Sequence, residues 1–114
     1  MLSLDTLRVF GANVEEGLGR CMNNEAFYLK LVKMAVADDK FPQLEAGLAE
    51  HDLDKAFQAA HAMKGVYGNL AITPLLTPVS AMTELLRSRT ETDYSALLQE
   101  AKAQHEKFLA LVND

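Results

Sequence analysis

Apolar residues recur at three- and four-residue intervals along most of the chain, the spacing that amphipathic helices require. The clearest stripe lies near the end of the chain and comprises Tyr94, Leu98, Ala101, His105, Phe108 and Val112. An earlier one comprises Phe27, Leu31, Met34 and Ala35. No segment shows sustained two-residue alternation, and no Asn-Gly or Asp-Gly pair marks a hairpin. The pattern therefore predicts an all-α protein.

Capping and turn residues divide this pattern into helices. The first is expected from Leu4 to about Phe10, with a stop near Gly11. The second begins after Asn23 or Asn24, either of which is a good N-cap, and ends near residues 37–40.

Proline and aspartate set the remaining boundaries. Residues 40–52 form another helix with Pro42 in its first turn, and Asp52 caps the helix that follows. The next helix starts at Thr73-Pro74 or at Thr77-Pro78 and runs to about Arg87. Four longer amphipathic helices with short connections predict an antiparallel four-helix bundle with additional short helices.

Length and composition fit one domain that covers residues 1–114 and is large enough to bury a core. Cys21 is the only cysteine, which excludes an intramolecular disulfide. The start of the chain lacks the apolar run of a signal peptide, and no run approaches the roughly 20 apolar residues that cross a bilayer. The net charge of −5 argues against general binding to nucleic-acid phosphates. We therefore expect a cytoplasmic monomer with no membrane segment.

Residues 59–71, "AAHAMKGVYGNLA", contain the most informative pattern. On a helical projection of about 100° per residue, Ala59, Met63, Val66 and Leu70 cluster on the side opposite His61. That side is the expected core face, and His61 is expected to point outward. Phe57, Lys64, Gly65 and Gly68 share the outward face with His61.

The two glycines on this outward face need an explanation. Each mid-helix glycine costs up to ~1 kcal/mol relative to alanine. Glycines that allow close helix packing are the alternative explanation, but Gly65 and Gly68 lie opposite the core stripe. We therefore predict that a partner approaches His61 and that side chains at positions 65 and 68 would obstruct it.

The residues beside the glycines indicate which chemistry the partner brings. Imidazole is a nucleophile that is largely neutral at pH 7. A phosphoryl group on such a ring brings close to two negative charges. Lys64, one helical turn after His61, is placed to offset that charge.

The stretch "HAMKGVYGNLA" resembles the signature of histidine-containing phosphotransfer (Hpt) domains, H-x-x-K-G-x-x-x-N-L-G. The matching positions are His61, Lys64, Gly65, Gly68, Asn69 and Leu70. The resemblance implies a helical bundle that relays phosphoryl groups between receiver-domain aspartates. It implies His61 as the phosphorylated residue, with Nε2 as the modified nitrogen, and Lys64 as its electrostatic partner. Gly65 and Gly68 would clear space for the docking receiver.

Two positions depart from the family pattern. Ala71 stands where the family usually has glycine, which leaves open where this helix ends. Val66 occupies a position often held by serine or alanine, and the projection directs it to the core. Neither position touches the expected phosphorylation site.

The other candidate residues favour structural roles. His105 lies on an apolar stripe and is expected to be partly buried at the bundle rim, and His51 is expected to be solvated. Cys21 is expected to be a packed thiol. Phe57 either folds back onto a neighbouring helix or offers the receiver an apolar contact. The histidine spacing makes a metal site improbable, and no cofactor is expected.

The favoured function is a phosphocarrier that works with response-regulator receiver domains and a hybrid sensor kinase. It is not an enzyme in the usual sense, since no G-x-x-x-x-G-K-[ST] nucleotide-binding loop occurs. Magnesium that assists transfer would belong to the receiver. Two alternatives remain: an excised phosphotransfer domain of a hybrid or chemotaxis-type sensor kinase, and a helical interaction module without chemistry.

Overall fold

The computed structural model describes residues 1–113, and all regular structure in that range is helical. The helices are α1 (Leu4–Phe10), α2 (Val14–Arg20), α3 (Glu25–Ala37), α4 (Phe41–Ala49), α5 (Leu53–Leu70), α6 (Thr73–Arg87) and α7 (Ser95–Asn113). The all-α prediction is confirmed. None of these helices is long and apolar enough to span a bilayer.

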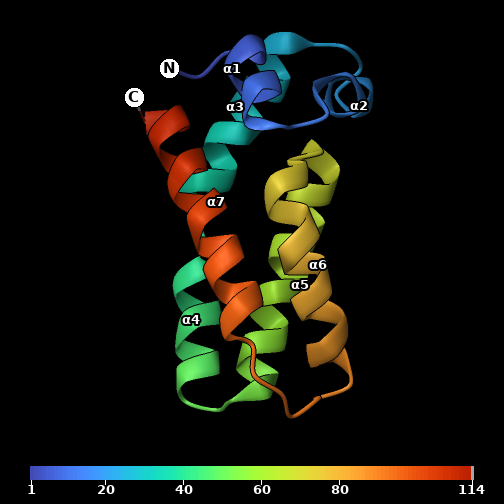
Figure 1. Cartoon of the computed structure of the whole chain (residues 1–114). Helices are drawn as coiled ribbons and strands as arrows, with labels where there is room; N and C mark the ends of the chain where they lie inside the picture. Colours follow the sequence, from blue (N-terminus) through green and yellow to red (C-terminus); the bar gives the residue numbers. More distant parts are fainter. Residues whose placement is uncertain (114) are drawn as a thin grey trace.

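The longer helices form an antiparallel bundle (Figure 1). α3 and α4 follow one another down one column, α5 returns, α6 descends and α7 ascends. α5 packs against both α4 and α6, and α6 packs against α7. The short helices α1 and α2 lie across one end of the bundle, where α1 contacts α7 and α2 contacts α5. The expected bundle with additional short helices is therefore present.

Local capping explains most helix ends. The Asp52 side chain accepts a hydrogen bond from the Lys55 amide at the start of α5, and Asn24 caps α3 in the same way through the Phe27 amide. α1 ends at Gly11, whose φ of 114° lies in the left-handed region that glycine adopts without steric cost. These three boundaries agree with the sequence-based expectation.

The structure shows which proline lies at the start of α6 and where α7 begins. α6 begins at Thr73, so Pro74 lies in its first turn and Pro78 lies inside the helix. The alternative start at Thr77 is wrong. Tyr94, expected as the first member of the last stripe, is buried but precedes α7, and its hydroxyl donates a hydrogen bond to the Thr90 carbonyl oxygen.

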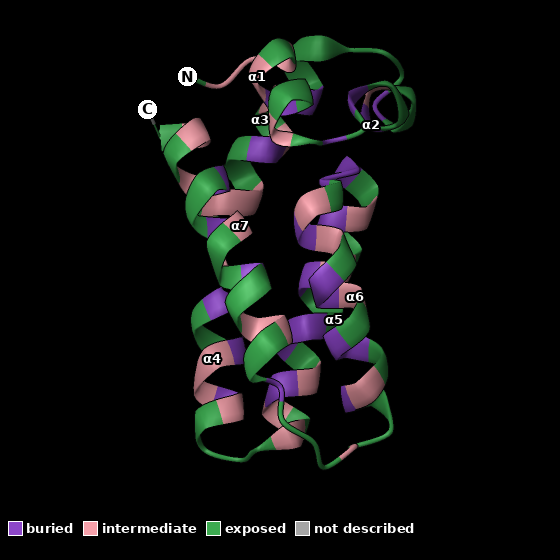
Figure 2. Ribbon diagram, viewed as in Figure 1, coloured by how far each residue is buried: buried purple, intermediate pink, exposed green. Residues whose placement is uncertain are grey.

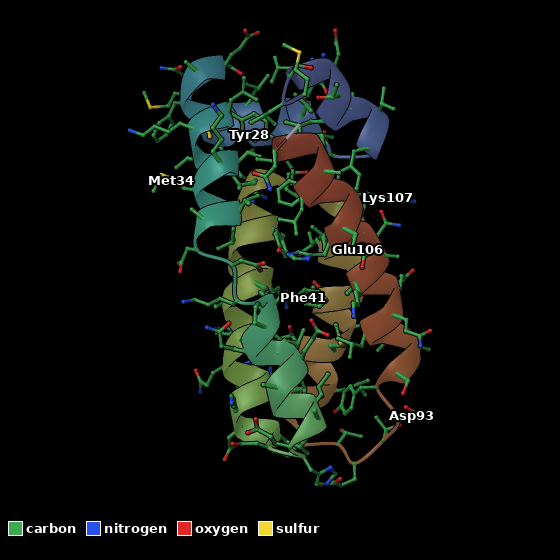
Figure 3. All side chains as sticks on the ribbon, turned by 90° about the vertical axis from the view of Figure 1, so that its left-hand side faces the viewer. Tyr28, Met34, Phe41, Asp93, Glu106 and Lys107 are labelled. Atoms are coloured by element: carbon green, nitrogen blue, oxygen red, sulfur yellow. The ribbon has the colours of Figure 1, made fainter. Side chains whose placement is uncertain are left out.

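The face that α3 turns to the core differs from the expected one. Phe27 and Met34 are 46% and 54% exposed, whereas Tyr28 and Val32 are fully buried. Figure 3 shows Met34 pointing away from the bundle and Tyr28 pointing toward it. The Tyr28 hydroxyl donates a hydrogen bond to the Leu70 carbonyl oxygen at 2.9 Å. Tyr28 was not among the residues expected on the core face, yet its polar tip finds a buried partner.

Helix α2 was not predicted at all. Its seven residues include Gly17 and Gly19, and glycine lowers helix propensity. Gly17 is required by packing, because a Cβ there would lie 2.5 Å from the Tyr28 ring and 2.8 Å from the Leu70 carbonyl oxygen. The buried faces of the helices meet along the bundle axis and beneath the short helices α1 and α2 (Figure 2).

Candidate functional site

His61 lies near the middle of α5 with its side chain exposed, as predicted. Its ring stacks on the ring of Phe57, one turn earlier, with centroids 5.4 Å apart and planes 20° from parallel. Phe57 is itself half-buried. The stacking limits the orientations of the imidazole while leaving the ring open to solvent.

Two arginines near the end of α6 lie against the same phenylalanine. The guanidinium carbons of Arg87 and Arg89 are 5.3 Å and 4.7 Å from the Phe57 ring centroid. These distances suit cation–π contact. Phe57 thus folds back onto the end of α6 and also contacts His61, as the first of its two interpretations expects. An apolar contact between Phe57 and a receiver stays a prediction. Neither arginine was singled out from the sequence.

Lys64 lies one turn after His61 on the side of α5 that faces α6. Its Nζ is 3.5 Å from Oε2 of Glu84, which also accepts a hydrogen bond from Arg87 Nε at 3.3 Å. The hydrogen bond from Arg87, followed by the charges of Arg87 and Lys64, holds the pKa of the Glu84 carboxyl below its usual value. Lys64 is therefore in an exposed ion pair, which costs little to break.

The glycines of α5 differ from those that the packing requires. A Cβ on Gly65 would have no heavy atom within 4 Å, and one on Gly68 would meet only Leu76 Cδ1 at 3.8 Å, an ordinary contact. A Cβ on Gly47 of α4, in contrast, would lie 2.6 Å from the Ala56 backbone nitrogen. Close helix packing therefore accounts for Gly47, and it does not account for Gly65 or Gly68.

An open hollow of about 300 Å³ surrounds these residues. We call it the His61 hollow, and it is lined by Arg20, His61, Lys64, Gly65, Gly68 and Asn69. Every lining residue except Arg20 comes from α5. The hollow thus gathers two cationic side chains beside the exposed imidazole, and none of its lining residues is acidic.

Arg20 was missed by the sequence analysis because it belongs to the unpredicted helix α2. Its Nη1 donates a hydrogen bond to the Gly68 carbonyl oxygen at 2.7 Å, and its Nη2 pairs with Glu16 Oε1 at 2.8 Å. The side chain remains 49% exposed. No local motif links Arg20 to residues 59–71, so only the packing of α2 against α5 reveals it.

The prediction that Val66 points to the core is wrong. Val66 is 40% exposed, and Tyr67, at 4%, is buried in its place. The buried arc of α5 also includes Ala56 and Ala60, because α4 and α6 both pack against this helix. It is therefore rotated by about 40° from the arc expected by projection, and His61 remains outside it.

Ala71, which stands where the family signature has glycine, lies directly after the end of α5. α5 ends at Leu70, and Ala71 takes the left-handed conformation with a φ of 56°. Glycine adopts this conformation freely, whereas alanine meets a penalty of about 1 kcal/mol. The helix therefore ends at this position with alanine in place of glycine.

The remaining histidines are unlike His61. His105 is 8% exposed, with Nε2 2.9 Å from Asp39 Oδ2 and its ring stacked on Phe41 at 4.5 Å. His51 is exposed just before the start of α5, and its Nε2 lies 2.7 Å from Glu91 Oε2. Cys21 is buried, as expected for a packed thiol. Among residues 1–113 no three His, Cys, Asp or Glu side chains gather in a way that could hold a metal ion.

A family model described as the Hpt domain matches residues 34–111 of the chain, more than half of its length. The matched range contains the whole of α4 to α6 and most of α7, and it includes His61 and Lys64. It leaves α1, α2 and most of α3 outside. No curated protein matches the chain, and no solved structure does.

Proposed function

The chain belongs to the Hpt domain family, and on this premise we propose that it carries a phosphoryl group on His61 between the aspartates of receiver domains. Hpt domains serve in histidine phosphotransfer within phosphorelays, where they meet receiver domains and kinases. One observation carries the proposal: an exposed imidazole, a lysine one turn away and two glycines without steric neighbours share the His61 hollow.

The proposed transfer begins with a phosphorylated aspartate of a receiver. The lone pair of a His61 ring nitrogen attacks phosphorus, an N–P bond forms, and the P–O bond to the aspartate breaks. The aspartate carboxylate leaves with the electrons of that bond, and the reverse reaction loads the next receiver. Phe57 holds the ring plane, which favours a near-attack geometry.

Lys64 would move from Glu84 to the phosphoryl oxygens when His61 is modified. The two residues are 3.5 Å apart in an exposed pair, so the exchange replaces one weak ion pair with a contact to a group of nearly two charges. Lys64 thus compensates charge and does not attack phosphorus. The protein acts as a phosphocarrier without its own nucleotide site, and its proposed partners are receiver domains and a hybrid sensor kinase.

Phosphorylation with a receiver that is itself phosphorylated tests the proposal. We expect one phosphoryl group per chain, labile in acid and stable in base, and located on His61 by mass spectrometry. Phosphoramidate, a small donor that phosphorylates histidines, should label the same residue without any receiver. Absence of label from both donors, or label confined to the exposed His51, would refute the assignment.

Lys64→Ala is expected to slow transfer and shorten the phosphohistidine lifetime, while transfer still occurs. Exposed charge contacts are worth up to about 1 kcal/mol, so the expected change is about fivefold. Lys55→Ala, which removes a lysine paired with Glu50 outside the His61 hollow, is the matched control. Equal rates for the two variants at low salt would show that Lys64 is only a surface residue.

Gly65→Leu is expected to block the partner while leaving the fold intact. Because nothing lies within 4 Å of a Cβ at this exposed position, the leucine side chain begins in open space, and its helix propensity adds up to ~1 kcal/mol. Transfer from a receiver should fall by an order of magnitude or more, since small displacements of reacting groups have effects of about 100-fold. Ala103→Leu, on an exposed face of α7, controls for added bulk. Normal transfer by Gly65→Leu would show that no partner approaches this surface.

A further inference from the structure

Two cationic side chains line the His61 hollow on a protein of net charge −5, and each of them pairs with a glutamate outside the lining. Arg20 contributes one of its two permanent cations from α2, which lies outside the matched residues 34–111. We propose that Arg20 is a docking residue that binds a carboxylate at the rim of the receiver's aspartate pocket. This inference rests on the proposed function, because a receiver that presents an aspartate offers an anionic surface to His61.

The position at which Arg20 is anchored suits a role in docking and not in the transfer step. Its guanidinium is fixed to the Gly68 carbonyl oxygen, and Gly68 lies seven residues beyond His61 on the same helix. Seven residues of α-helix span about 10 Å. A phosphoryl group on the His61 ring is therefore closer to Lys64, one turn away, than to Arg20. A partner surface that covers the hollow would reach both cations.

The donor geometry of Arg20 suits a carboxylate. A guanidinium has five N–H groups, and Arg20 uses one nitrogen on Gly68 and another on Glu16. The remaining N–H groups of this half-exposed side chain can form the paired hydrogen bonds that arginine makes with carboxylates. Glu16 and the Gly68 carbonyl oxygen hold the guanidinium at the edge of the hollow, which Arg20 lines.

The position of Arg20 is built into the fold. Gly17, three residues before it, is packed beneath the Tyr28 ring and the Leu70 carbonyl oxygen. The Asn13 amide, at the N-cap of α2, donates a hydrogen bond to the Ala71 carbonyl oxygen at 2.9 Å. Both contacts attach α2 to the end of α5. With α2 packed on the end of α5, Arg20 adds a charge that the matched residues 34–111 lack, and it favours receivers that present a carboxylate there.

Two donors distinguish docking from catalysis. A panel of phosphorylated receivers is first tested with the wild type, and the receiver that transfers its phosphoryl group fastest is chosen. Arg20→Gln and the wild type are then compared in two assays, phosphorylation by phosphoramidate and transfer from this receiver. We expect KM for that receiver to rise about fivefold, with kcat and the phosphoramidate rate nearly unchanged, because removal of an interface charge acts mainly on association. The difference should shrink at high salt.

Lys107→Gln removes one positive charge from an exposed position of α7, outside the His61 hollow, and should change neither rate. Arg20→Lys retains the charge without the fork and should give an intermediate KM, which keeps the test valid if Arg20→Gln loosens α2. An unchanged KM, or an equal loss with phosphoramidate, overturns the docking role. If neither phosphoramidate nor a phosphorylated receiver labels His61 in the wild type, the proposed function fails instead.

Discussion

Replacing His61 with glutamine is expected to abolish phosphoryl acceptance and leave the bundle folded. Glutamine lacks the ring nitrogen that would attack phosphorus. Since His61 is exposed on the outer side of α5, its removal should change the free energy of unfolding by no more than about 0.5 kcal/mol. The measurements are label retained after exposure to phosphoramidate and to a phosphorylated receiver, beside circular dichroism and a denaturant titration.

The other two histidines supply the controls for this experiment. His51→Gln changes an exposed histidine at the far end of the helix and should retain full labelling. His105 contacts Asp39 and Phe41 and is almost fully buried, so we expect no label on it in the folded protein. Retained label on a natively folded His61→Gln variant would place the acceptor elsewhere and end the assignment.

Alanine at Gly47 and at Gly65 is expected to change stability in opposite directions. The Cβ at position 47 would lie 2.6 Å from the Ala56 nitrogen and 2.9 Å from its Cα, and neither backbone atom can move unless α4 and α5 separate. Overpacking of this kind costs about 1–3 kcal/mol, in spite of the better helix propensity of alanine. Gly65→Ala meets no atom and should gain up to ~1 kcal/mol.

Denaturant unfolding of the two variants beside the wild type measures this difference. The contrast separates a glycine that the fold needs from one that the fold only tolerates. A loss of stability in Gly65→Ala would mean that the bundle itself requires this glycine, and the outward-facing explanation for it would fail. Unchanged stability in Gly47→Ala would show that α4 and α5 can separate at little cost.

The parts of the fold that were predicted correctly depend on local signals. Asp52, Asn24 and Gly11 act on neighbouring backbone groups, so their effect can be read from a few residues. The outward direction of His61 was also predictable, because the buried arc of α5 is wide and a rotation of about 40° does not reach the opposite side. The roles of His61, Lys64, Gly65 and Gly68 in transfer remain predictions.

What the sequence did not reveal depends on contacts between distant segments. Val66 and Met34 are apolar and exposed because neighbouring helices cover other faces of α5 and α3. Arg20 reaches the His61 hollow only because Gly17 allows α2 to approach Tyr28 and the end of α5. Such placements follow from the shape of the assembled core, and a projection of one helix contains no information about it.

The short helix α2 has a consequence for how the surface around His61 behaves over time. Seven-residue helices are not stable by themselves, so α1 and α2 keep their form through contacts with α5 and α7. Such a segment can detach and return in a local opening that leaves the four-helix bundle folded. His61 and Lys64 would persist through each opening, whereas Arg20 would leave with α2. In the open state the hollow would keep its reactive part and lose its charged rim, so the fraction of molecules with the rim closed would set how much Arg20 contributes to the affinity for an acidic partner.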